Sequence, residues 1–142
     1  MKVYHSSNKM DWETPDGLFQ KLYQEFPMVL DVAARADNTK LPLWRETDGL
    51  EYNWGDTGSC CWMNPPYGRN VGKWVKKAWE ESLKGVQTVC LLPSRTDTKW
   101  FHEYIYQNIS VEIRFLKGRV KFKGAENGAP FPSMIVIFNP PC

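Results

Sequence analysis

Four consecutive residues, Asn64-Pro65-Pro66-Tyr67, combine groups that can hold a planar amino group. The side-chain carbonyl of Asn64 and the backbone carbonyl of Pro65 are two acceptors, which suit the two hydrogens of an NH2 group. The prolines hold φ at about −65° and bring no N–H, so these acceptors lie on a stiff turn without competing donors. Tyr67 adds a flat ring that can stack on an aromatic base. The tetrapeptide therefore indicates a site for methylation of an amino group.

The same tetrapeptide also suits an ordinary loop. Asn often starts a turn, and Pro-Pro continues neither a strand nor a helix. The four residues alone leave both interpretations open, and the surrounding elements must decide between them.

Length and composition favour one domain, predicted to span residues 1–142. The net charge of +2 is too small to indicate nucleic acid by itself. No apolar run has transmembrane length, and the N-terminus lacks the hydrophobic stretch of a signal peptide. We therefore predict a cytoplasmic protein that does not enter a membrane.

The cysteines and histidines do not form a metal-binding pattern. The four cysteines show no C-x-x-C spacing, and the two histidines, His5 and His102, are far apart in the chain. We therefore predict reduced thiols and no metal.

Helical and strand patterns alternate in the first two-thirds of the chain. Thr14-Pro15 is predicted to begin a helix, with Thr14 as its cap. Residues 35–57 are polar, with turn signals, and predict only short or distorted elements. The predicted strands are 28–31, 60–63, 86–92, 111–115, 120–122 and 133–138, with further helices after Asn70 and after Thr96.

This order of elements predicts an α/β sheet that is parallel in its core, with an antiparallel hairpin at one edge. In such sheets ligands bind beyond the carboxyl ends of the strands. Asp31 and Asn64 are both expected at that edge.

The chain resembles the small phage DNA adenine methyltransferases of the Dam-like family, which use S-adenosylmethionine. The resemblance spans nearly the whole chain and implies a Rossmann-like methyltransferase fold without a separate target-recognition domain. It also implies direct methyl transfer to the exocyclic amino group of an adenine flipped out of double-stranded DNA. The matching stretches are 11–15, 30–34, 62–68, 91–101, 113–119 and 130–133.

The resemblance implies roles for individual residues. Asn64, Pro65, Pro66 and Tyr67 would form the catalytic turn, with Tyr67 stacking on the extruded base. The cofactor would contact Trp12, Thr14, Asp31, Ala33 and Asp48, with Asp31 meeting the methionine ammonium and Asp48 the adenine ring. Other interpretations stay open, because Asp31 and Thr14 can each be a helix cap and Asp48 can form a turn.

Basic residues near the C-terminus are candidates for DNA contact. Lys117, Arg119, Lys121 and Lys123 alternate, which on a strand would place them on one face. Such a ridge can follow a phosphate backbone, although lysines also protect a solvated edge strand. Arg95 would lie nearer the catalytic turn, and residues 124–132 are expected to form a mobile loop over the substrate.

Two other functions remain open at this point. A glutamine side-chain amide in a protein is also a planar NH2 group, so the same turn could serve a protein glutamine methyltransferase. The glycine-rich loop usual after the first strand is absent, which leaves room for an inactive DNA-binding relative. The resemblance suggests a short recognition site such as GATC, and a homodimer could enlarge the DNA footprint.

Overall fold

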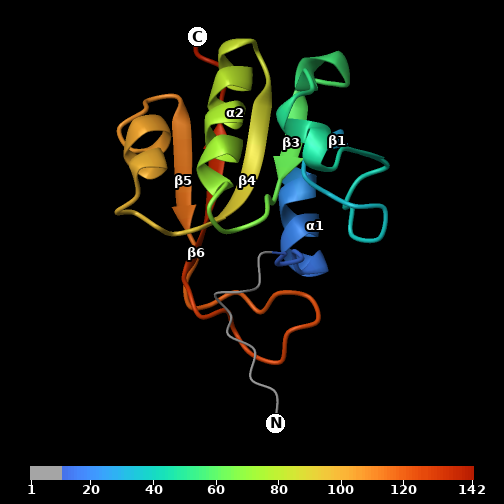
Figure 1. The fold of residues 1–142 in the computed structure, drawn as a ribbon, viewed down its shortest axis with the longest axis vertical. Helices are drawn as coiled ribbons and strands as arrows, with labels where there is room; N and C mark the ends of the chain where they lie inside the picture. The colour runs from blue at the N-terminus through green and yellow to red at the C-terminus, as the bar shows by residue number, and fades with distance from the viewer. Residues whose placement is uncertain (1–10) are drawn as a thin grey trace.

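A mixed β-sheet runs through residues 11–142, the part of the chain that our computed structural model describes (Figure 1). Its six strands follow the order β2-β1-β3-β4-β6-β5. The neighbours β2, β1, β3 and β4 are parallel, whereas β6 runs antiparallel to both β4 and β5. The strands are β1 (Leu30–Asp31), β2 (Leu43–Trp44), β3 (Cys60–Met63), β4 (Gln87–Pro93), β5 (Val111–Phe115) and β6 (Ser133–Phe138).

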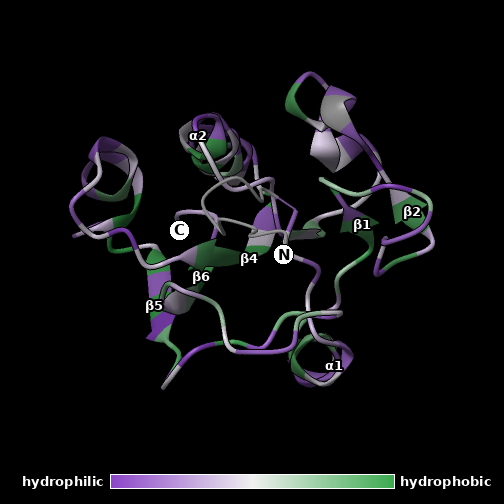
Figure 2. Cartoon of the chain, turned by 60° about the horizontal axis from the view of Figure 1, so that its bottom comes forward, coloured by the Kyte–Doolittle hydropathy of each residue, from purple (hydrophilic) through white to green (hydrophobic). Residues whose placement is uncertain are grey.

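Helices and loops cover both faces of this sheet. In Figure 2, α2 and η4 lie on one side of the strands, and α1 lies on the other with the segment between β5 and β6. The helices are α1 (Asp16–Glu25), the 3-10 turns η2 (Thr47–Leu50) and η3 (Trp54–Asp56), α2 (Val71–Leu83) and the π-helical turn η4 (Phe101–Ile105).

The central strands are buried along almost their whole length and are mostly apolar. Every residue of β3 and β6 is buried, as is all of β4 except its first residue. Such continuous runs, rather than alternating ones, are expected where a sheet is covered on both faces. This burial makes the sheet a rigid platform for the loops at its carboxyl edge.

The predicted fold class, an α/β sheet with a parallel core and an antiparallel C-terminal hairpin, is confirmed. Residues 35–57 form only short elements, as expected. The helix predicted after Thr96 is present but short, with residues 99–100 α-helical and running directly into the π-helical turn η4. Thr14 does not cap α1, whose N-cap is Pro15 with no side-chain hydrogen bond.

The predicted strand 120–122 is wrong. Gly118 takes a φ of 72° and turns the chain away from the sheet just after β5. Beyond that turn the backbone pairs with none of the six strands: the Ala129 amide donates to the Val120 carbonyl within the same loop at 2.8 Å, and the Lys123 amide donates to the Glu13 carbonyl, before α1, at 2.9 Å. The alternation of exposed and buried side chains from 119 to 123 persists without a strand.

Gly49 brings the turn η2 against the end of β1. A Cβ added to Gly49 would lie 2.1 Å from the carbonyl oxygen of Val32 and 3.0 Å from the Trp74 ring. A Cβ added to Gly17 in α1, in contrast, meets no atom within 4 Å. At Gly49, in contrast to Gly17, the missing side chain allows two segments to approach each other.

Gly49→Ala should therefore destabilise the protein by about 1–3 kcal/mol, since either η2 or the segment after β1 must move. Gly17→Ala is the matched control and should be neutral or stabilising by up to about 1 kcal/mol, because Ala is the better helix former. Urea denaturation of both variants measures the difference. Equal stabilities would contradict the close packing at Gly49.

Candidate active site

A cavity of about 260 Å³ opens at the carboxyl ends of β1 and β3. Its walls come from the segment before α1, the loop after β1 and the turn after β3. The position agrees with the rule that ligands bind beyond the carboxyl ends of parallel strands. Its lining comprises Asp11, Trp12, Glu13, Thr14, Asp31, Ala33, Ala34, Arg35, Asn38, Lys40, Glu46, Trp62, Asn64, Pro65, Pro66 and Trp74.

Asn64 follows the last residue of β3 and is one of the residues that line this cavity. Its Nδ2 donates to the Trp12 carbonyl oxygen at 2.6 Å and to Thr14 Oγ1 at 2.9 Å. Its Oδ1 is buried and has no hydrogen-bond partner among the described residues. A buried acceptor without a donor lowers the stability of the fold, and a ligand that donates a hydrogen bond to this oxygen would remove that cost.

The prolines and the tyrosine of the motif differ in their access to solvent. Pro65 and Pro66 line the cavity, whereas Tyr67 is only 2% exposed. The Tyr67 hydroxyl donates to the Leu91 carbonyl oxygen at 2.9 Å. Burial raises the pKa of this hydroxyl well above its ordinary value, and the nearby charge of Arg95 opposes the shift. Tyr67 is thus a neutral, anchored ring.

Aromatic side chains from the segment between β5 and β6 cover Tyr67. The rings of Phe122 and Phe131 lie 6.3 and 5.6 Å from the Tyr67 ring, both nearly edge-on. The same two rings pack against Trp12 at 5.3 and 5.1 Å. In this arrangement no face of Tyr67 is open, so stacking of a base on it stays a prediction that requires these rings to move.

Asp31 is a buried acid at the end of β1. Its Oδ2 accepts from the Lys40 amide at 2.9 Å and its Oδ1 from the Ala33 amide at 3.4 Å. Burial raises the pKa of Asp31 to about 6, although the Lys40 and Ala33 amides oppose this shift. The side chain lines the cavity, so a cation bound there would meet an acid that is mostly ionised at neutral pH.

The structure brings four of the five predicted cofactor residues to this cavity. Trp12, Thr14, Asp31 and Ala33 all line it. Asp48 does not: it is exposed on η2, where its carboxylate lies 3.4 Å from Arg45 and accepts from the Glu46 amide. The assignment of Asp48 to the cofactor stays a prediction without support from this geometry.

Several lining residues escaped the sequence analysis. Lys40 links the cavity to α1, because its backbone amide holds Asp31 while its Nζ lies 2.9 Å from Asp16 Oδ1. Glu46 and Trp74 come from an irregular segment and from α2. A lysine in an irregular polar segment carries no local signal, whereas the helical spacing of Val71, Trp74, Val75 and Ala78 could have identified Trp74 as an inward-facing residue of α2.

The predicted DNA contacts lie outside the cavity. Lys117, Arg119 and Lys121 are exposed and form no ion pair within the described residues, and Arg95 is partly buried. Lys123 differs, since it lies 3.6 Å from Glu13 and 3.4 Å from Asp16. The segment between β5 and β6 lies at the end of the molecule toward which the β3 arrow points (Figure 1).

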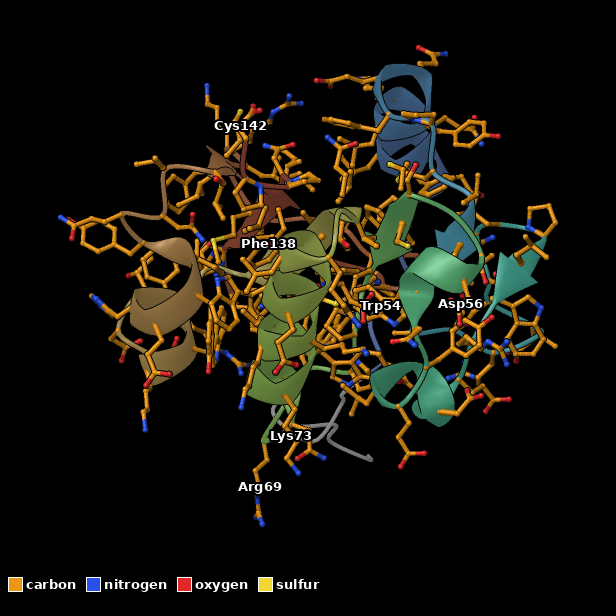
Figure 3. The ribbon with its side chains drawn as sticks, turned by 90° about the horizontal axis from the view of Figure 1, so that it is seen from above. Trp54, Asp56, Arg69, Lys73, Phe138 and Cys142 are labelled. Atoms are coloured by element: carbon orange, nitrogen blue, oxygen red, sulfur yellow. The ribbon has the colours of Figure 1, made fainter. Side chains whose placement is uncertain are left out.

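Two further cations, Arg69 and Lys73, project from the start of α2 (Figure 3). Both are exposed. Both come shortly after the Asn64–Tyr67 turn in the sequence. This position could have identified them as candidates for contact with an anionic ligand.

Residues 11–142 contain neither a metal-binding cluster nor a membrane-spanning helix. No group of His, Cys, Asp or Glu side chains within residues 11–142 could hold a metal ion, and His5 lies outside the described residues. Cys60, Cys61 and Cys90 are free and buried, and Cys142 is free and exposed. None of the helices in this range is both long and apolar enough to cross a membrane.

Comparison with known proteins identifies the family to which the chain belongs. The family model described as DNA N-6-adenine-methyltransferase (Dam) matches residues 3–141. A DNA N-6-adenine-methyltransferase of Haemophilus phage HP1 is 30% identical over 143 aligned positions, which cover 94% of this chain and 81% of the relative. The chain therefore belongs to the Dam family of DNA N-6-adenine methyltransferases.

Proposed function

We propose that this protein transfers a methyl group from S-adenosylmethionine to the exocyclic amino nitrogen of adenine in double-stranded DNA, with the base rotated out of the duplex. The observation that carries the proposal is the buried, unpartnered Oδ1 of Asn64 beside a cavity that also contains Asp31. The same acceptors would also suit a protein glutamine amide, but the family model and the relative are both DNA adenine methyltransferases and favour adenine.

Asn64 and Pro65 act on the amino group of the base. Asn64 Oδ1 accepts one of its hydrogens, and the Pro65 carbonyl, which receives no hydrogen bond from the described residues, accepts the other. The nitrogen lone pair of adenine is delocalised into the ring, and two acceptors that hold both hydrogens favour the pyramidal nitrogen that can attack a methyl group. Positioning the amino nitrogen against the methyl donor supplies the remaining rate enhancement, so no covalent intermediate with a protein nucleophile is needed.

The residues around the cavity suit the proposed cofactor. Asp31 offers a buried carboxylate for the methionine ammonium, and the Trp12, Trp62 and Trp74 rings offer apolar walls for the remaining atoms. Ala33, beside Asp31, leaves the backbone accessible. When bound, S-adenosylmethionine supplies a methyl group activated by a sulfonium leaving group.

The exposed cations of the segment between β5 and β6, together with the partly buried Arg95, are proposed to contact DNA. Arg95, Lys117, Arg119 and Lys121 lack ion-pair partners within residues 11–142, so phosphates need not displace an existing carboxylate. Lys123 is already engaged by Glu13 and Asp16 and is less available. A homodimer and a cytoplasmic location in a bacterial or phage-infected host remain predictions.

Asn64→Ala removes the acceptor while leaving the cavity wall largely intact. Transfer of labelled methyl groups to unmethylated DNA should fall at least about 100-fold, the loss typical of one preorganised polar contact to a transition state. Calorimetry should show cofactor affinity changed by less than about threefold, since Asn64 acts on the base. Asn53→Ala, at the exposed residue that precedes η3, is the control, and near-normal rates in Asn64→Ala would rule out the role.

The raised pKa of Asp31 makes cofactor affinity depend on pH. Below the pKa of about 6 the side chain is protonated and attracts an ammonium weakly. Because ionisation proceeds as the pH rises, affinity should increase between about pH 5 and pH 7 and then level off. Asp31→Asn should flatten the profile and weaken binding at neutral pH by about 10- to 100-fold. Asp56→Asn, at an exposed acid, should keep the wild-type profile (Figure 3).

Neutralising Lys117, Arg119 and Lys121 together, each to Gln, tests the DNA contact. If these side chains meet phosphates, the slope of log affinity against log salt should decrease by about 2–3, close to one unit per charge. Lys76→Gln on the exposed face of α2 should leave the slope unchanged. An unchanged slope in the triple variant would mean that the three cations only keep this loop solvated.

A further inference from the structure

Thr14 faces the catalytic turn and is almost entirely buried, with 1% exposure. It neither caps α1 nor points to solvent, since the N-cap is Pro15 and has no side-chain hydrogen bond. Instead Thr14 Oγ1 accepts a hydrogen bond of 2.9 Å from Asn64 Nδ2. This contact joins residues that are 50 positions apart in the chain.

The partners of Asn64 determine which end of its amide faces the cavity. The Trp12 carbonyl oxygen, 2.6 Å from Nδ2, can only accept, so it must face the NH2 end. Thr14 Oγ1 receives the second hydrogen of that NH2 group. With both hydrogens engaged, Oδ1 is left as the unpartnered end of the amide.

The opposite orientation would be unsuitable for the proposed reaction. A flipped amide would place its NH2 group toward the amino group of adenine, so that donor would face donor. It would also place Oδ1 against the Trp12 carbonyl, where two acceptors repel. The orientation of one side chain therefore decides whether the turn can hold an amino group at all.

We propose that Thr14 is a positioning residue that acts through Asn64, holding its amide so that Oδ1 faces the target amino group. This inference rests on the proposed function. It differs from the role expected from the resemblance, in which Thr14 contacts the cofactor. The segment before α1 thus contributes to the target-base site as well as to the wall of the cofactor cavity.

Thr14→Val keeps the shape of the side chain and removes only the acceptor. The methyl-transfer rate at saturating cofactor and DNA should fall by about 10- to 100-fold, because a misoriented Asn64 no longer accepts from the base. Cofactor affinity should change by less than about twofold, less than the loss of one hydrogen bond. Thr14→Ser, which retains the hydroxyl, should restore most of the rate.

The orientation of Asn64 can be observed without turnover. In 15N-labelled protein, the side-chain NH2 protons of Asn64 should exchange slowly and have distinct shifts in the wild type and in Thr14→Ser. Thr14→Val should shift at least one of these resonances and speed its exchange. The matched control is Thr88→Val, because Thr88 is equally buried but its hydroxyl has no hydrogen-bond partner within the described residues. It should change neither the rate nor the Asn64 resonances.

The outcomes separate this inference from the proposed function. A Thr14→Val variant with a normal rate and unchanged Asn64 resonances would overturn it, as would weaker cofactor binding with a normal rate at saturation. If wild-type protein transfers no methyl group to DNA, the proposed function fails, while the resonances still report whether Thr14 holds Asn64. If Thr14→Val does not fold, Thr14→Ala compared with Thr14→Ser applies the same test.

Discussion

The two hydrogen bonds donated by Asn64 Nδ2 are the interaction on which the candidate site depends. They tie the turn after β3 to the segment before α1, and they leave Oδ1 as a buried acceptor without a partner. An unsatisfied buried acceptor usually costs 1–3 kcal/mol, about the stability effect of a typical damaging mutation. The fold tolerates this cost at a position where a ligand can supply the missing donor.

A similar constraint applies at the end of β1. Asp31 is buried deeply enough to raise its pKa to about 6, and two backbone amides partly compensate for the lost solvation. One of these amides belongs to Lys40, whose side chain in turn contacts Asp16 at the start of α1. Lys40 therefore connects the buried acid to the start of α1.

The segment between β5 and β6 completes the site from the other side. Phe122 and Phe131 pack on both Trp12 and Tyr67, and Lys123 bonds to the segment before α1 through its backbone and its side chain. The loop that carries the exposed cations thus contacts the residues that hold Asn64. A structural change in this loop would therefore alter the packing of Phe122 and Phe131 against Tyr67 in the Asn64–Tyr67 turn.

The sequence by itself determined strands β1, β3, β4, β5 and β6, though not β2, as well as the position of the Asn64–Tyr67 turn and of the acid at the end of β1, because apolar runs and stiff prolines act locally. It failed for residues 120–122, where an alternating pattern resembles a strand but the backbone bonds within its own loop, to Ala125 and Ala129. It also mistook Thr14 for a helix cap. Only the tertiary structure decided that Thr14 meets Asn64, that Phe122 and Phe131 cover Tyr67 and that Lys40 supports Asp31. These contacts join residues distant in the chain, and no local pattern specifies which distant partner a buried polar group will find.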